Sequence, residues 1–174
     1  MMYIYHYFYT QPMNMVYIET AVMFVVWAVL MLILPKKPRR IFAITGLCLS
    51  LLLILSLTIL KRNSNGSHDV SLIPFVSFTY AKTQPEFYRT MYMNILLFVP
   101  LGMSMPFALP KKLKLKPLIT IGTGFLLSVI VEACQYIFIL GRCETDDVIM
   151  NTIGVSVGVL SYLIVYLIRI RKEK

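Results

Sequence analysis

The chain has 174 residues, of which 58% are hydrophobic and only 14% are charged. Soluble domains usually contain about 45–50% apolar and about 25% charged residues, so a soluble fold would leave too much apolar surface in water. The composition therefore indicates an integral membrane protein. The net charge of +9 does not indicate nucleic acid binding, because the basic residues stand in short blocks between apolar segments and no polar domain accompanies them.

Five apolar segments approach the roughly 20 residues that a helix needs to cross the hydrocarbon core of a bilayer. In chain order they cover residues 16–34, 41–60, 91–109, 117–140 and 148–168. The third segment contains Pro100, Gly102 and Pro106, so we expect it to be kinked or locally unwound. The predicted fold class is all-α, with about five transmembrane helices.

The basic blocks predict the orientation of these helices. They lie between the first two segments, between the third and fourth, and in the tail: Lys36, Lys37, Arg39, Arg40; Lys111, Lys112, Lys114, Lys116; Arg169, Arg171, Lys172, Lys174. Because these positions alternate along the chain, they share one side of the membrane, and the positive-inside rule makes that side cytoplasmic. The N-terminus is then outside and the C-terminus inside. Lys61 and Arg62 fall on the opposite side, but they are too few to reverse the assignment.

The sequence divides into four parts. Residues 1–60 hold an aromatic N-terminal segment and two helices, 61–90 form an extracytoplasmic loop, 91–168 form a core of three helices, and 169–174 are a basic cytoplasmic tail. The N-terminal segment lacks the basic region and cleavage site of a signal peptide, so we expect it to remain at the membrane interface. Within the loop, the apolar stretch VSLIPFVSF is too short to span, which predicts an interfacial or re-entrant segment near residues 70–80.

Five polar residues stand in or beside the apolar segments, toward the ends predicted to face outside: Asn94, Glu132, Gln135, Arg142 and Asn151. An ionisable group in hydrocarbon costs about 3 kcal/mol on insertion scales, so it usually marks a function or a fixed partner. With a rise of about 1.5 Å per residue, the helical positions fall in one outer layer. The loop that carries Arg142, Asp146 and Asp147 covers this layer.

Two stripes of residues support this convergence. Ser128, Glu132 and Gln135 share one face of the fourth segment, and Asp147 and Asn151 share a face of the fifth, which continues through Gly154 and Gly158. A short loop joins these two segments, so they are expected to be antiparallel neighbours whose polar stripes face each other.

The candidate catalytic residues are Glu132, Asp146 and Asp147, and the candidate substrate-binding residues are Asn94, Gln135, Arg142 and Asn151. The alternative for Glu132 is a buried carboxyl that fixes helix packing, and the alternative for the amides Gln135 and Asn151 is interhelical hydrogen bonding. Either aspartate would also suit the N-terminus of the fifth helix.

A metal site is a further alternative for the same residues. Together with Glu132 and Asn94, the two aspartates would offer oxygen ligands to a divalent cation such as Mg²⁺ or Ca²⁺. The histidines and the three cysteines, Cys48, Cys134 and Cys143, show neither zinc spacing nor a disulfide framework.

Four motifs resemble those of a known protein family: IPF at 73–75, NILLFVPLG at 94–102, SVIVEACQ at 128–135 and GRCETDDVIMNTIGVSVG at 141–158. In order and spacing, the segment from about 71 to 166 resembles the VanZ-like family of bacterial membrane proteins. Ser71 stands where the family pattern has another polar residue, so no ligand-like role is carried over to it. The resemblance implies a bacterial cytoplasmic membrane protein associated with resistance to teicoplanin or to related lipid-bearing glycopeptides.

Three functions compete at this point. The chain could bind or modify an amphiphile at the outer leaflet, such as an envelope lipid, a cell-wall precursor or the antibiotic. It could instead be a small transporter, although five spans without a repeat lack the inverted symmetry of many transporters. It could also be a scaffold for other envelope proteins. The lipid bilayer is the partner that the composition implies, and a homo-oligomer is compatible with all three functions. The sequence shows no Ser-His-Asp or Cys-His arrangement that would indicate a particular reaction.

Overall fold

The computed structural model describes residues 11–60, 68–110 and 112–173. They form α2 (Met13–Ile33), α3 (Lys36–Leu55), the π-helix η1 (Ser56–Leu60), β1 (Val70–Ser71), α4 (Val76–Ala81), α5 (Glu86–Ala108), α6 (Lys116–Ile137), β2 (Cys143–Glu144) and α7 (Thr145–Glu173). Most of the aromatic N-terminal segment, and both Lys61 and Arg62, lie outside the described residues.

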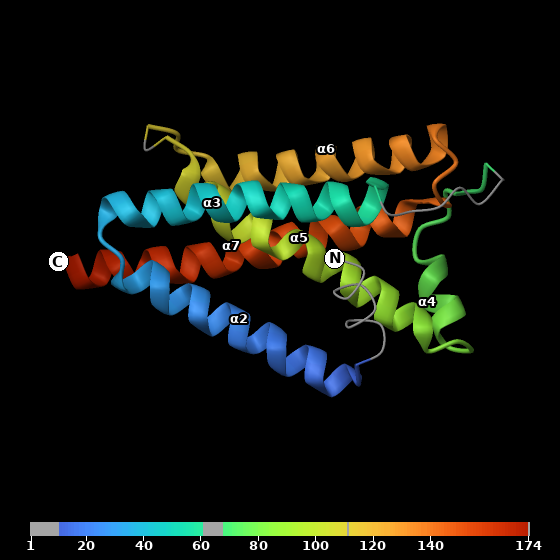
Figure 1. Cartoon of the computed structure of the whole chain (residues 1–174), viewed down its shortest axis with the longest axis horizontal. Helices are drawn as coiled ribbons and strands as arrows, with labels where there is room; N and C mark the ends of the chain where they lie inside the picture. Colours follow the sequence, from blue (N-terminus) through green and yellow to red (C-terminus); the bar gives the residue numbers. More distant parts are fainter. Residues whose placement is uncertain (1–10, 61–67, 111, 174) are drawn as a thin grey trace.

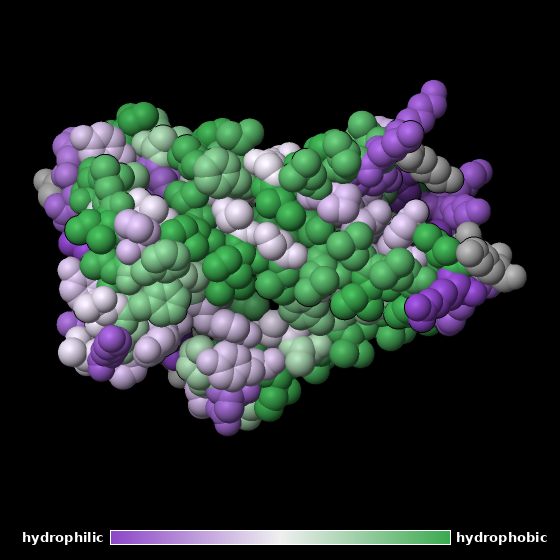
Figure 2. Space-filling model, turned by 180° about the vertical axis from the view of Figure 1, so that it is seen from behind, coloured by the Kyte–Doolittle hydropathy of each residue, from purple (hydrophilic) through white to green (hydrophobic). Residues whose placement is uncertain are grey.

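Five helices are long and apolar enough to cross a membrane: α2, α3 with η1, α5, α6 and α7. The predicted all-α membrane fold is therefore confirmed. The α2–α3 turn, the α5–α6 connection and the C-terminus lie at one end of the bundle, while α4 and the α6–α7 connection lie at the other (Figure 1). We call these the basic end, after the lysine and arginine blocks, and the acidic end, after Glu144, Asp146 and Asp147. Figure 2 shows the corresponding surface, with apolar side chains across the middle and hydrophilic ones toward the two ends.

The segment was predicted to be kinked or locally unwound; the helix α5 is continuous through Pro100 and Pro106, so it is not unwound there. Each proline removes one backbone N–H from the helix. Pro106 is buried, and α5 packs against both α3 and α7, which holds it in helical form. The irregular turn occurs instead at the end of α3, where residues 56–60 form η1. The other boundaries differ modestly: α6 ends at Ile137 and α7 begins at Thr145.

The centre of the fold is the contact between α5 and α7, where glycines allow the two backbones to touch. A Cβ at Gly154 would overlap the carbonyl oxygen of Ile95, and one at Gly102 would overlap that of Val155. Gly158 meets the backbone of α5 in the same way. Small residues at this spacing are typical of close helix pairs in membranes. The small-residue surface predicted for the last segment therefore faces α5.

The acidic end is closed by a connection between two distant segments. The strands β1 and β2 pair in parallel, with Val70 opposite Cys143 and Ser71 opposite Glu144. The short helix α4 follows β1 and does not cross the membrane, and the apolar side chains of Leu72, Ile73 and Phe75 around its start are exposed. These features agree with the interfacial segment predicted near residues 70–80.

Candidate polar site at the acidic end

Glu132 lies near the outer end of α6 and is only 4% exposed. Its Oε2 atom accepts a hydrogen bond from the backbone N–H of Glu144, at 2.9 Å. Ser128 and Gln135 are also buried, which confirms the predicted polar stripe on this helix. A buried carboxylate with a backbone donor is both stabilised and fixed in position.

Arg142 lies at the rim of the site, and its side chain is 48% exposed. Its Nη1 atom is 3.6 Å from Oε1 of Glu144, whose backbone N–H is the group bound to Glu132. Glu144 thus connects the exposed guanidinium to the buried carboxylate, one through its side chain and the other through its backbone. The guanidinium retains an exposed part that can meet a ligand.

Asp146 is 2% exposed and holds the start of α4. Its Oδ1 accepts the backbone N–H of Phe75, and its Oδ2 accepts that of Ser77 at 2.7 Å. Phe75 has a φ of 64°, a left-handed conformation that is uncommon for a residue with a bulky side chain. The carboxylate therefore caps α4 and fixes this turn. We had expected one of the two aspartates to cap its own helix, whereas Asp146 caps a helix about 70 residues away in sequence.

The side-chain amides of Asn94 and Asn151 connect the helices α5, α6 and α7. Asn94 of α5 donates from Nδ2 to Oδ1 of Asp147, at 2.7 Å. One turn further into α7, Asn151 donates to Oγ of Ser128 on α6, at 2.8 Å. The predicted meeting of the α6 and α7 stripes is present at Ser128 and Asn151. The Oδ1 atom of Asn151, whose residue is 3% exposed, has no hydrogen-bond partner among the described residues.

Gln135 faces a different neighbour from the other candidates. Its Nε2 donates to the backbone carbonyl of Thr58, at 3.1 Å, inside η1. A π-helical turn displaces backbone groups from the regular hydrogen-bond pattern, and such turns are frequent at functional sites. Gln135 thus connects α6 to η1, at the end of α3.

The pKa of the Cys143 thiol reflects the negative charges that surround it in the site. Burial raises the pKa of Cys143, and the nearby carboxylates of Glu132, Asp147 and Glu144 raise it further. Negative groups from α6, β2 and α7 therefore lie close enough to act on one atom. A raised pKa keeps the thiol protonated at neutral pH, which makes it a weak nucleophile.

The structure gives no support to the divalent-cation alternative. Over the described ranges, no group of three or more His, Cys, Asp or Glu residues is arranged to hold a metal ion. Both carboxylate oxygens of Asp146 are used by α4. The site is thus a set of paired polar groups, with a half-exposed arginine at its rim and a buried amide oxygen at its base.

Sequence reasoning missed three contributors to this arrangement. Glu144 appeared only as part of the motif at 141–158, Ser77 only as part of an apolar stretch, and Thr58 only as part of a transmembrane segment. The polar GRCETDD stretch was a signal for Glu144. Ser77 and Thr58 contribute backbone groups to the contacts described above, and no local pattern reveals these.

A family model described as VanZ/LLP1 matches residues 42–166, which include the whole polar site and leave α2 outside. Neither the search of curated proteins nor that of solved structures found a match.

Proposed function

The chain belongs to the VanZ/LLP1 family, and on this premise we propose that it contributes to tolerance of teicoplanin-type glycopeptides in a bacterial cytoplasmic membrane. In this proposal the acidic end faces outward, and its polar site binds the head of an amphiphile. The candidates are an envelope lipid, a lipid-linked cell-wall precursor and the lipid-bearing antibiotic itself.

The observation that carries the proposal is the linkage from Arg142 through Glu144 to Glu132. A guanidinium presents a planar set of donors that suits phosphate and carboxylate groups. The ion pair with Glu144 directs that group, while Glu132 fixes the backbone of Glu144 from below. Exposed apolar side chains of the β1–α4 segment lie at the same end of the bundle and suit the apolar part of an amphiphile.

The site favours binding over covalent catalysis. Cys143 is a nucleophilic side chain on which the carboxylates of the site act, and its raised pKa disfavours the reactive thiolate. The buried Oδ1 of Asn151 can accept a donor from a ligand or from a reorganised side chain, a role that needs no bond to be broken.

The test is the inhibitory concentration of teicoplanin for a susceptible Gram-positive host expressing the wild type, Glu132→Gln or Arg142→Ala, with membrane abundance measured in parallel. Lys82→Ala is the matched control, because Lys82 is an exposed cation at the same end but outside the polar site. We expect protection by the wild type and Lys82→Ala, and loss of protection by the two site variants at equal abundance.

Equal protection by all four proteins would show that the site is structural and would favour a scaffold. Substrate-dependent flux in liposomes containing the purified protein would instead favour transport. If the wild type gives no protection, the resistance role is rejected for this chain.

A further inference from the structure

A groove runs between α2 and the rest of the bundle, far from the polar site in sequence. One cavity of about 510 Å³ is lined by residues of α2 from Ile18 to Leu30, together with Phe42 of α3. A second cavity of about 200 Å³ adjoins it, with a lining that includes Gly46 and Ser50 of α3 and Ser104 of α5. Met23, Trp27 and Phe42 line both cavities, so they form one continuous groove with α2 and α3 as walls and α5 as floor.

The groove has the dimensions and surface of an acyl-chain site. From Ile18 to Leu30 it follows about 18 Å of helix, and the acyl chains of one leaflet fill about 15 Å, half of the hydrocarbon core. Its lining is mostly apolar, and its polar members are Glu19, toward the end away from the basic blocks, and Ser50 of α3 and Ser104 of α5. In Figure 1, α2 diverges from the bundle toward its N-terminal end.

The basic end of the groove offers charge for a lipid headgroup. Leu30 and Phe42 lie beside the α2–α3 turn, where Lys36, Lys37 and Arg40 are exposed. The neighbouring Arg169 donates to the carbonyls of Met31 and Leu32 at the end of α2. Basic pockets between transmembrane helices are typical binding places for anionic headgroups.

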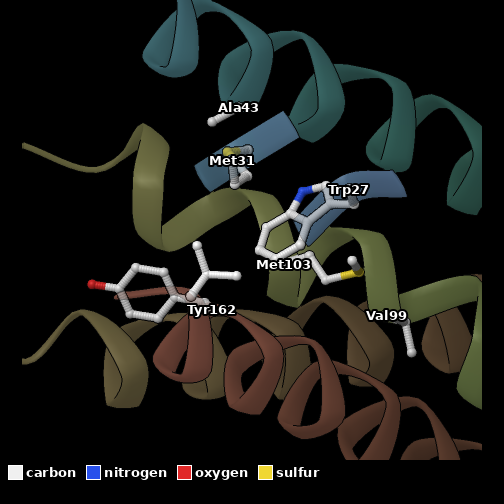
Figure 3. Close-up of a cluster of buried hydrophobic side chains, with 7 residues drawn as sticks. Trp27, Met31, Ala43, Val99, Met103 and Tyr162 are labelled. Carbon is white, nitrogen blue, oxygen red and sulfur yellow. The ribbon is translucent and has the colours of Figure 1, made fainter. Parts of the chain in front are cut away.

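Trp27 provides an independent argument for a ligand in the groove. Its side chain packs with Met31 among Ala43, Met103 and Tyr162 (Figure 3), and the residue is only 8% exposed. Its Nε1–H has no hydrogen-bond acceptor among the described residues. A buried donor without a partner is costly. A glycerolipid drawn into the groove would bring ester oxygens, which are acceptors.

We propose that this groove binds an anionic phospholipid, with its headgroup at Lys36, Lys37 and Arg40 and an acyl chain along α2 past Trp27. The lipid belongs to the leaflet that contacts the basic end. This proposal is independent of the function proposed above, because it uses α2, which lies outside the residues matched by the family model.

Trp27 is the single tryptophan of the chain and so reports directly on the groove. The experiment measures the fluorescence of Trp27 in the full chain, reconstituted into two kinds of phosphatidylcholine bilayer. One contains phosphatidylglycerol brominated along the acyl chain, and the other contains the same fraction of phosphatidylcholine brominated in the same way. We expect the brominated anionic lipid to bind near Trp27 at least about fivefold more tightly, the preference contributed by one basic residue near a headgroup.

Two double variants locate the headgroup. Lys36→Gln/Lys37→Gln should reduce the preference to the part contributed by Arg40, whereas Lys112→Gln/Lys114→Gln, the same change of charge at the same end, should leave it unchanged. Equal quenching by both brominated lipids, or quenching by neither, would overturn the proposal. So would an anionic preference that is undiminished in Lys36→Gln/Lys37→Gln, since the headgroup would then lie elsewhere.

Discussion

The contact of α5 with α7 and the attachment of α2 represent two ways of building a membrane bundle. Between α5 and α7, Gly154 and Gly158 bring the backbones together with no room for a methyl group. By contrast, α2 exposes several large apolar side chains to the bilayer, including Ile18, Val22 and Val25. Its buried residues near the basic end, Trp27 and Met31, anchor it to the cluster shared with α5 and α7.

The difference shows which part of the molecule positions the polar site. Asn94, Asp147 and Asn151 stand on α5 and α7, at the outer end of the close contact. A shift between these helices would separate their hydrogen-bonding partners. The hydrogen bonds described above for that site involve no residue of α2, and the looser attachment of α2 leaves the groove. The family match likewise covers α5 to α7 and begins at residue 42, beyond α2.

The largest predicted effect is that of a methyl group in the close contact. Gly154→Ala places a Cβ against the carbonyl of Ile95, so α5 and α7 must separate. We expect a loss of about 3 kcal/mol or more, at the upper end of the range for overpacked interiors. Membrane abundance and the midpoint of thermal unfolding in detergent would measure it.

Gly122→Ala is the matched control, because a Cβ at Gly122 meets no atom within 4 Å. Alanine is the better helix former by about 1 kcal/mol in an exposed helix interior, so this control should be neutral or slightly stabilising. Similar unfolding midpoints for the two variants would contradict the close contact and, with it, the comparison with α2.

A smaller effect is predicted for the anchor of α2. Arg169→Met removes the donors that contact the carbonyls of Met31 and Leu32, at 2.9 and 3.1 Å. Hydrogen bonds from a charged donor contribute about 1.5–3 kcal/mol. We expect faster hydrogen exchange in the last turns of α2 and unchanged exchange in α5 and α7.

Arg171→Met removes an exposed charge two residues further along the same helix and should leave exchange in α2 unchanged. If Arg169→Met accelerates exchange throughout the bundle, α2 belongs to the same cooperative unit as α5 and α7. The distinction between the two regions would then be wrong.

Features with a local cause were predictable from the sequence. The five helices follow from the length of apolar runs, and the buried face of Ser128, Glu132 and Gln135 follows from helical periodicity. The contact of Ser128 with Asn151 followed from the short α6–α7 connection, which makes the two helices antiparallel neighbours.

Features that depend on the placement of distant segments were not predictable. Asp146 was expected to act in a site or to cap α7, and it caps α4 instead, since β1 and β2 bring that segment to it. Gln135 was grouped with the α6–α7 residues, and it binds a carbonyl of η1 that only the π-helical turn presents. The unwinding expected at Pro100 is absent because packing on α3 and α7 outweighs the local preference.

The smallest predicted effect tests whether negatively charged groups surround Cys143 at the acidic end. Burial and the carboxylates of Glu132, Asp147 and Glu144 raise the pKa of Cys143, so its thiol stays protonated at pH values where the unfolded chain would ionise. Its stabilising contribution is therefore complete below the unfolded pKa and is lost as the pH rises above it. In a Cys48→Ala/Cys134→Ala background, alkylation of Cys143 should begin at a higher pH in the folded protein than in the denatured one.

The same alkylation measurement on Glu144→Gln separates the effect of a carboxylate on the pKa of Cys143 from the effect of burial. Removing this negative charge should lower the pKa and increase the alkylation rate at pH 8 by about twofold, the scale of a partly screened charge interaction. Glu86→Gln, at the same end on α5, is not among the charges that act on the thiol and should leave the rate unchanged. If Glu144→Gln does not increase the rate, the charge of Glu144 does not act on the thiol. The convergence of this carboxylate with those of Glu132 and Asp147 around Cys143 would then be contradicted, even if the close contact of α5 with α7 is correct.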